Sequence, residues 1–230
     1  TLAAGRREGR LEAGSGPVLV FPAQADKQGG MQNSRSARAP VFGFVAFACL
    51  ALPAFAAPVG GSGLLGKRYF ETSASQIDYQ NFEDNGYAVA AAVNVPVAAH
   101  LDAGVGFAHN WLEGDRDDDS QDLSVHATVH TEFGALRPFA SAELGHEWWS
   151  VSDDFYYTIS AGAEYPITDR FSLSGSVTWG EFLADDWDGG AFSASLRANY
   201  WFTDSLAASI ATAAYEGGSW GYGLALVAVF

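Results

Sequence analysis

The chain is poor in cysteine, methionine and basic residues. Its 230 residues include one cysteine, one methionine and 12 Lys and Arg against 27 Asp and Glu, for a net charge of −15. Nucleic acid is bound mainly through Lys and Arg, so this charge balance excludes a nucleic-acid partner. A single cysteine cannot build a disulfide framework. The chain also lacks, after residue 57, any apolar run long enough for a membrane-spanning helix.

The first part of the sequence predicts a cleavable signal peptide. The predicted signal peptide begins at Met31, carries Arg35 and Arg38, and continues into an apolar run over residues 41–52. The motif Ala54-Phe55-Ala56 is a cleavage site of the A-x-A type. A transmembrane anchor is disfavoured, because roughly a dozen apolar residues are too few to span a bilayer of about 30 Å.

The distribution of charge supports a division at this site. Residues 1–56 have a net charge of +3, whereas residues 57–230 hold 24 acidic and six basic groups. We expect upstream non-domain sequence over residues 1–30, a signal peptide over 31–56, a short linker over 57–65 and the folded domain over 66–230. A lipid-modified Cys49 is disfavoured, because Ala46 stands where a lipobox has leucine.

The mature chain is a succession of runs in which apolar and polar residues alternate. In the clearest run Phe171, Leu173, Gly175, Val177 and Trp179 share one face, and Ser and Thr occupy the other. Alternation with a period of two predicts β-strands. Ten strands are expected, over residues 67–79, 86–95, 100–111, 121–133, 138–149, 155–165, 170–181, 191–202, 206–215 and 219–230.

The aromatic residues of the apolar faces gather at the two ends of these strands. One end holds Trp111, Trp148, Phe155, Tyr157, Trp179, Phe192, Trp220 and Tyr222, and the other holds Phe133, Tyr165, Phe171, Tyr200, Phe202 and Phe230. Small aliphatic residues lie between them. Two aromatic girdles around an aliphatic band are typical of a barrel that crosses a bilayer with two interfaces.

The connections between the strands also alternate in kind. Short turns such as residues 96–99 and 166–169 alternate with acidic loops such as 113–120 and 184–190. We therefore predict an all-β fold, a closed antiparallel transmembrane β-barrel of ten strands, with eight strands as the alternative. An even number of strands places both termini on the same side, which is expected to be the periplasm.

The last strand carries a more specific resemblance. Trp220, Tyr222, Leu224, Leu226, Ala228 and Phe230 alternate on one face and end at a terminal aromatic residue. Together with the turns Tyr165-Pro166-Ile167-Thr168-Asp169 and Phe202-Thr203-Asp204, this pattern resembles the small outer membrane β-barrel, or porin-like, family over residues 66–230. Ala228 departs from the family pattern, in which a larger hydrophobic residue is commoner.

The resemblance implies a structural or porin-like protein of the bacterial outer membrane. Tyr222, Leu224, Leu226 and Phe230 would form the signal read by the barrel assembly machinery, and outer-membrane lipid and lipopolysaccharide would be the other partners. No enzyme activity, cofactor or metal centre is expected, and a barrel enzyme that acts on membrane lipids is the less favoured alternative.

Inward-facing polar residues are the first candidate site. The expected cluster is Arg197, Glu132, Glu143, Glu164, His126 and His130, and acids outnumber bases in it. It would form either a network that satisfies buried charge or the wall of a narrow, cation-preferring pore. A nucleophilic or metal site at His126, Thr128 and His130 is disfavoured, because no catalytic motif surrounds Thr128 and alternate residues of a strand lie about 6.6 Å apart.

An acidic outer rim is the second candidate site. It would consist of Asp115, Asp117, Asp119, Asp185, Asp186 and Asp188. The Asp-x-Asp-x-Asp spacing resembles a calcium loop without its glycine and distal glutamate. The rim is either a solvated loop tip or a surface for adhesion and for Ca²⁺ or Mg²⁺.

Signal-peptide cleavage can be tested directly. We expect the protein recovered from an outer-membrane fraction to begin at Ala57, because Ala54-Phe55-Ala56 presents small residues to the signal peptidase. N-terminal sequencing and intact mass measure this. A mature chain that still contains residues 31–56 would contradict it.

Overall fold

The computed structural model describes residues 62–79, 85–113, 119–149, 153–183 and 190–230. The predicted signal peptide and Cys49 lie outside these residues. Ten strands make up the fold: β1 (Tyr69–Asp78), β2 (Asn85–Ala98), β3 (Leu101–Leu112), β4 (Asp119–His130), β5 (Arg137–Trp149), β6 (Asp153–Thr168), β7 (Phe171–Phe182), β8 (Ala191–Trp201), β9 (Leu206–Tyr215) and β10 (Trp220–Val229). The predicted strands match these bounds to within a few residues.

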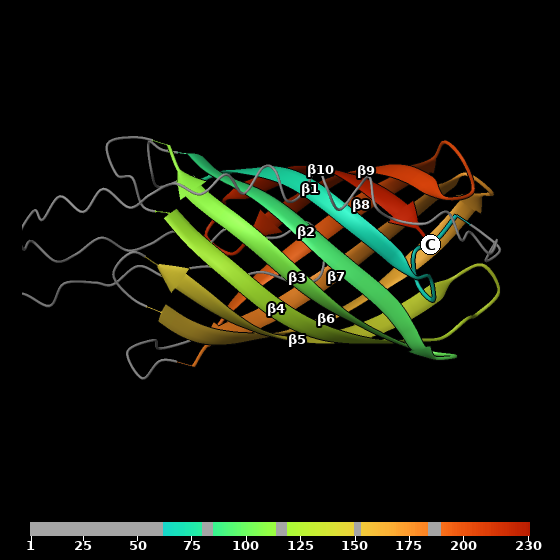
Figure 1. The fold of residues 1–230 in the computed structure, drawn as a ribbon, viewed down its shortest axis with the longest axis horizontal. Helices are drawn as coiled ribbons and strands as arrows, with labels where there is room; N and C mark the ends of the chain where they lie inside the picture. Colours follow the sequence, from blue (N-terminus) through green and yellow to red (C-terminus); the bar gives the residue numbers. More distant parts are fainter. Residues whose placement is uncertain (1–61, 80–84, 114–118, 150–152, 184–189) are drawn as a thin grey trace, which may run out of the picture.

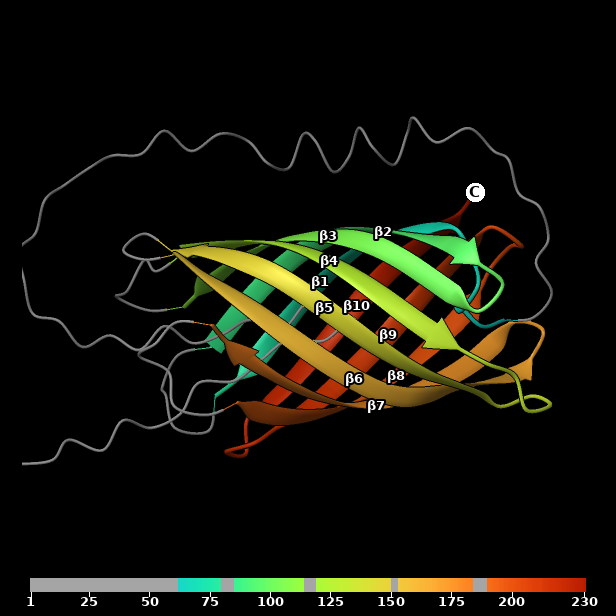
Figure 2. The ribbon, with the colours of Figure 1, turned by 90° about the horizontal axis from the view of Figure 1, so that it is seen from below.

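Every strand pairs antiparallel with its neighbours, and β1 also pairs with β10. The sheet is therefore a closed barrel of ten strands, and the alternative of eight strands is wrong. Figures 1 and 2 show the strongly tilted strands wound around a common axis. Among the described residues, no helix is long and apolar enough to cross a membrane.

The lengths of the strands suit a bilayer. They run from 10 residues in β1 to 16 in β6, and a strand tilted by about 45° needs about 9–11 residues to cross the hydrocarbon. Short connections gather at the end of the barrel that holds the C-terminus, which we call the turn end (Figure 1). The opposite end, at which β1, β3, β5, β7 and β9 end, is the loop end.

The outer face of the barrel carries an exposed aliphatic band in its middle. Its members include Val105, Val125, Leu144, Ile159, Val177, Leu196, Ile210 and Leu224. In water such a surface would aggregate, whereas in lipid it is the favourable state. An apolar outer band on a closed barrel is the construction of a transmembrane β-barrel.

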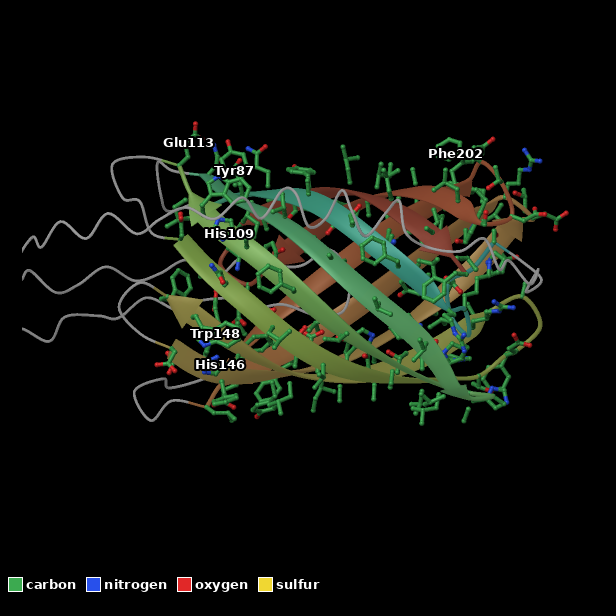
Figure 3. The ribbon with its side chains drawn as sticks, viewed as in Figure 1. Tyr87, His109, Glu113, His146, Trp148 and Phe202 are labelled. Atoms are coloured by element: carbon green, nitrogen blue, oxygen red, sulfur yellow. The ribbon has the colours of Figure 1, made fainter. Side chains whose placement is uncertain are left out.

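Aromatic side chains border this band at both ends. In Figure 3, Tyr87 and Trp148 lie at the loop end and Phe202 lies at the turn end. The Tyr87 ring stacks on the Trp111 ring, and its hydroxyl donates a hydrogen bond to Glu113 Oε2 at 2.8 Å. This position suits the boundary between hydrocarbon and head groups.

Charge differs between the two ends. Within the described ranges, Lys67, Arg68, Arg137 and Arg170 all lie at the turn end. The loop end carries exposed or partly exposed carboxylates, which include Glu113, Asp119, Asp153, Glu181 and Glu216. Exposed carboxylates of the turn end, on Glu132, Asp169 and Asp204, nearly balance the bases there, so the loop end is the acidic end of the described barrel.

The membrane-facing band predicts where the outer surface tolerates a charged side chain. Val125 in the middle of β4 and Val97 at the turn end of β2 are similarly exposed, at 55% and 56%. We expect Val125→Arg to lower the free energy of unfolding by about 2–4 kcal/mol, and the matched Val97→Arg by about 0–1 kcal/mol. Urea unfolding of the protein in lipid vesicles measures both. Equal losses would contradict the assigned position of the membrane.

Candidate functional site

The interior of the barrel has two unlike walls. On β2, β3, β9 and β10 most inward positions hold small residues, namely Gly86, Ala88, Ala90, Ala92, Gly104, Gly106, Ala108, Ala207, Ala211, Ala213, Gly221, Gly223 and Ala225. On β4 to β6 six inward positions hold long polar or aromatic residues, namely Asp122, His126, Glu143, Glu147, Tyr156 and Glu164, and Ser, Thr or Gly occupy most of the others. The small residues leave room for the long side chains of β4 to β6.

Two glycines show how closely the rings lie against the wall. A Cβ atom on Gly104 would collide with the His126 ring, and one on Gly145 would collide with the Tyr156 ring. Both rings therefore cover the backbone of the strand beside them. This arrangement directs the His126 and Tyr156 side chains along the wall.

Arg197 forms an ion pair that crosses from β8 to β1. Its Nη1 and Nη2 atoms donate to the two carboxylate oxygens of Glu71 at 3.1 and 2.8 Å. Its remaining donors reach Asn199 Oδ1 and Ser209 Oγ, each at 2.8 Å. A planar guanidinium paired with both oxygens of one carboxylate is a strong, directional contact. The predicted network that satisfies buried charge thus has Arg197 at its centre.

Residues 62–67 fill the turn end of the lumen, and we call them the N-terminal plug. The Ser62 hydroxyl donates to the carbonyl oxygens of Thr168 and Phe171. The Ser62 carbonyl accepts from the Ser172 hydroxyl and from the Trp201 indole. One residue of the plug is thus held by groups of β6, β7 and β8.

Two inward carboxylates bind the backbone of the plug. Glu164 accepts from the amides of Leu64 at 2.6 Å and Leu65 at 3.4 Å. Asp102 accepts from the Gly66 amide at 2.9 Å. Amides that enter a membrane-embedded barrel without a strand partner would otherwise be unsatisfied, so these carboxylates replace the missing ladder.

Lys67 completes the plug. Its carbonyl accepts from Asn94 Nδ2 at 3.1 Å, and its ammonium lies 4.0 Å from the centre of the Trp201 ring. Leu64 packs with Trp201, Ala207 and Val227 in a buried apolar cluster. The plug is therefore held by hydrogen bonds, a cation–π contact and apolar packing together.

A cluster of apolar and aromatic side chains fills the lumen at the loop end, and we call this cluster the loop-end cap. The cluster consists of Ile77, Tyr79, Ala88, Tyr156, Phe182, Ala213 and Tyr215, with Leu112 and Trp149 packed against it. Most of these residues are almost completely buried. Side chains thus occupy both ends of the lumen.

Between the plug and the cap lies a chamber of about 130 Å³. Leu64 and Leu65 of the plug and Tyr156 of the cap contribute to its lining. Its charged groups are Glu71, Asp102, Asp122, Glu143, Glu164 and Arg197. Five carboxyl groups face one guanidinium, so the chamber is strongly acidic.

Most of the predicted lumen cluster lines this chamber. His126, Glu143, Glu164 and Arg197 do so. His130 lies nearby, with its Nε2 atom 3.6 Å from Asp102 Oδ1. Glu132 lies elsewhere: it follows the end of β4, is largely exposed, and pairs with Arg137 at 3.0 Å.

The two histidines and Thr128 do not act on one another through hydrogen bonds. His126 Nε2 lies 3.2 Å from Asn94 Oδ1, whereas the Thr128 hydroxyl bonds the Ser141 hydroxyl at 2.9 Å. Their spacing along β4 thus directs each to a different partner. In the described residues no group of three His, Cys, Asp or Glu side chains could hold a metal ion.

The second predicted site is only partly described. Asp119 is exposed at the beginning of β4, while Asp115, Asp117, Asp185, Asp186 and Asp188 lie outside the described residues. The acidic rim and its Ca²⁺ or Mg²⁺ binding remain a prediction.

On the last strand, Tyr222, Leu224 and Leu226 are exposed on the outer face, and the Phe230 amide donates to the Arg68 carbonyl.

Several residues of the chamber were not among the candidates from the sequence. Glu71 lies on β1, whose two faces both mix polar and apolar residues, so its inward side was not evident. Asp122 was assigned to no site, although its alternation with His126 and Thr128 on β4 carried that signal. Leu64 and Leu65 stand in a segment with no periodic pattern.

No protein-family model and no curated protein sequence matches the chain. Solved structures of outer membrane β-barrels resemble it in architecture. The outer membrane channel from Pseudomonas putida F1 is 12% identical, with 76% of this chain and 100% of that chain covered and a TM-score of 0.47.

Two further structures show the same kind of similarity. The KdgM porin in complex with disordered oligogalacturonate is 8% identical over 70% of this chain and 99% of its own, with a TM-score of 0.43. The N-terminal β-barrel domain of Pseudomonas aeruginosa OprF is 15% identical over 72% and 99%, with a TM-score of 0.40. The similarity concerns the general barrel architecture.

The Arg197–Glu71 pair predicts a coupled loss of stability. Glu71→Leu alone leaves a buried guanidinium without its partner, so we expect it to lower the free energy of unfolding by about 3–5 kcal/mol. Arg197→Met alone is expected to have a similar effect. The double variant removes both charges and should be much less destabilised than the sum of the single changes.

Urea unfolding of the four proteins in the same detergent measures this cycle. Strictly additive losses would show that the two side chains do not interact. The heat-dependent shift in gel mobility that folded barrels display confirms that each variant has closed.

Proposed function

We propose that the protein is a non-catalytic, porin-like barrel of the bacterial outer membrane that is closed at rest. The observation that carries this proposal is the filling of the lumen at both ends, by the N-terminal plug and by the loop-end cap. A ten-stranded barrel lies between the filled eight-stranded barrels and the open porins of sixteen or more strands. Its own side chains are thus sufficient to close it.

The distribution of surface groups supports the location and the orientation. A closed barrel with an aliphatic outer band and aromatic borders belongs in a membrane, and in bacteria such barrels stand in the outer membrane. Short turns face the periplasm in these proteins, and longer loops face outward. The turn end, with the plug and the C-terminus, is accordingly periplasmic, and lipopolysaccharide surrounds the acidic loop end.

The charge of the chamber supports a preference for cations when the barrel opens. Its five carboxyl groups exceed the one guanidinium, which is already paired with Glu71. Carboxylates that line a narrow passage favour cations over anions. The absence of catalysis is proposed because His126, Thr128 and His130 each engage a different neighbour.

Planar-bilayer recording tests the proposal with three forms of the protein. The first begins at residue 57 and keeps the plug, the second begins at residue 68, and the third begins at residue 68 and also carries Tyr156→Ala and Tyr215→Ala in the cap. We expect no steady conductance from the first form, at most brief openings from the second, and discrete cation-selective steps from the third. Both obstructions must be removed because they lie in series.

Folding of each form is checked by heat-modifiable gel mobility before recording. If the first form conducts as well as the third, the plug and the cap do not close the lumen. If the third form is folded but silent, or passes anions as readily as cations, the porin-like function with cation preference is wrong.

A further inference from the structure

The chamber contains two carboxyl groups that the ion pair and the plug do not engage. Glu71 is paired with Arg197, and Glu164 and Asp102 bind amides of the plug. Asp122 and Glu143 lie on the wall formed by β4 and β5, where the Tyr156 hydroxyl lies 3.3 Å from Glu143 Oε1 and also forms a hydrogen bond with the Asp122 carboxyl. The ion pair and the plug thus account for three of the five carboxyl groups.

Asp122 is the better defined of these two groups. Its side chain lines the chamber, the residue is 6% exposed, and its Oδ2 atom has no hydrogen-bond partner among the described residues. A carboxylate buried without a counter-charge is costly, whereas one that meets a cation is stabilised.

The described Lys and Arg residues do not supply that charge, and His126, which also lines the chamber, has its Nε2 atom 3.2 Å from Asn94 Oδ1. Lys67 lies over Trp201, Arg137 pairs with Glu132, and Arg197 pairs with Glu71. Arg68 and Arg170 are exposed at the turn end. A positive charge beside Asp122 would therefore come from a bound ligand.

From these observations we infer that the chamber is a binding site for a small organic ammonium ion, with Asp122 and Glu143 as its anionic contacts. Three aromatic residues, Tyr69, Phe139 and Tyr156, also line the chamber. Aromatic rings combined with carboxylates recognise ammonium groups, through cation–π attraction and charge-assisted hydrogen bonds.

The size and the ligand geometry favour this class over a metal ion. No three described His, Cys, Asp or Glu side chains are grouped to coordinate a metal. An ammonium group donates up to three hydrogen bonds and requires no fixed coordination shell. A volume of 130 Å³ corresponds to about four water molecules, which suits an ion of the size of methylammonium or ethylammonium.

Methylammonium is the probe for the test. The protein is refolded in detergent at a series of concentrations of radiolabelled methylammonium chloride, so that the chamber is loaded before the plug closes it, and the retained ligand is measured after gel filtration. We expect about one ion per protein, and Asp122→Asn to weaken binding about tenfold or more, the loss that a buried charge-assisted contact represents.

The matched control is Asp153→Asn, which makes the same chemical change at an exposed position of the loop end. It should bind methylammonium as the unmodified protein does. If Asp122→Asn fails to show heat-modifiable mobility, Glu143→Gln is measured in its place, with the same expected loss.

Three results would overturn the inference. Absence of saturable binding to the unmodified protein would show that Asp122 is satisfied by a proton. Equal binding to the Asp122→Asn and Asp153→Asn proteins would place the ligand on external carboxylates. Displacement by potassium chloride at equal concentration would show that the site takes alkali cations instead. The inference does not rest on conduction, so a silent barrel in bilayer recordings leaves it standing.

Discussion

The structure depends on the hydrogen-bonded ladder between the first and the last strand. Tyr69 is paired with Val229 at one end of that ladder, and Asp78 is paired with Trp220 at the other. In hydrocarbon an open sheet edge would leave a row of backbone amides and carbonyls without partners, at several kcal/mol for each group. Closure removes both edges at once, and the other features of the barrel follow from it.

Closure creates an interior that alternate residues of all ten strands must share. The width of such an interior is set by the number and tilt of the strands, so it cannot expand to fit a large side chain. Tyr156 and His126 are accommodated because Gly145 and Gly104 stand beside them. A charged side chain in this interior also needs a partner inside it. Arg197 of β8 is stabilised because Glu71 of β1, which lies 126 residues earlier in the chain, pairs with it.

The sequence predicted those features that local periodicity encodes. The outward face of β7, from Phe171 to Trp179, and the aromatic borders could be read from alternation alone, because a strand exposes every second residue to lipid. The inward position of His126 followed from the same rule. Ten strands, rather than eight, were also correctly counted from the turns.

Partners across the lumen could not be predicted in this way. Which residue of β1 meets Arg197 depends on the tilt and stagger of the closed sheet, and the mixed faces of β1 concealed Glu71. The segment over residues 57–65 was expected to be a linker, and its described residues, 62–65, lie in the lumen. Its hydrogen bonds involve backbone groups of Leu64 and Leu65, which carry no sequence signature.

The plug also determines an order of events in folding. Ser62 is bound by Ser172 and Trp201, which follow it by 110 and 139 residues along the chain. Its binding site does not exist until β6, β7 and β8 are side by side. The first described residues of the chain thus cannot reach their places before strands that lie more than 100 residues later have paired.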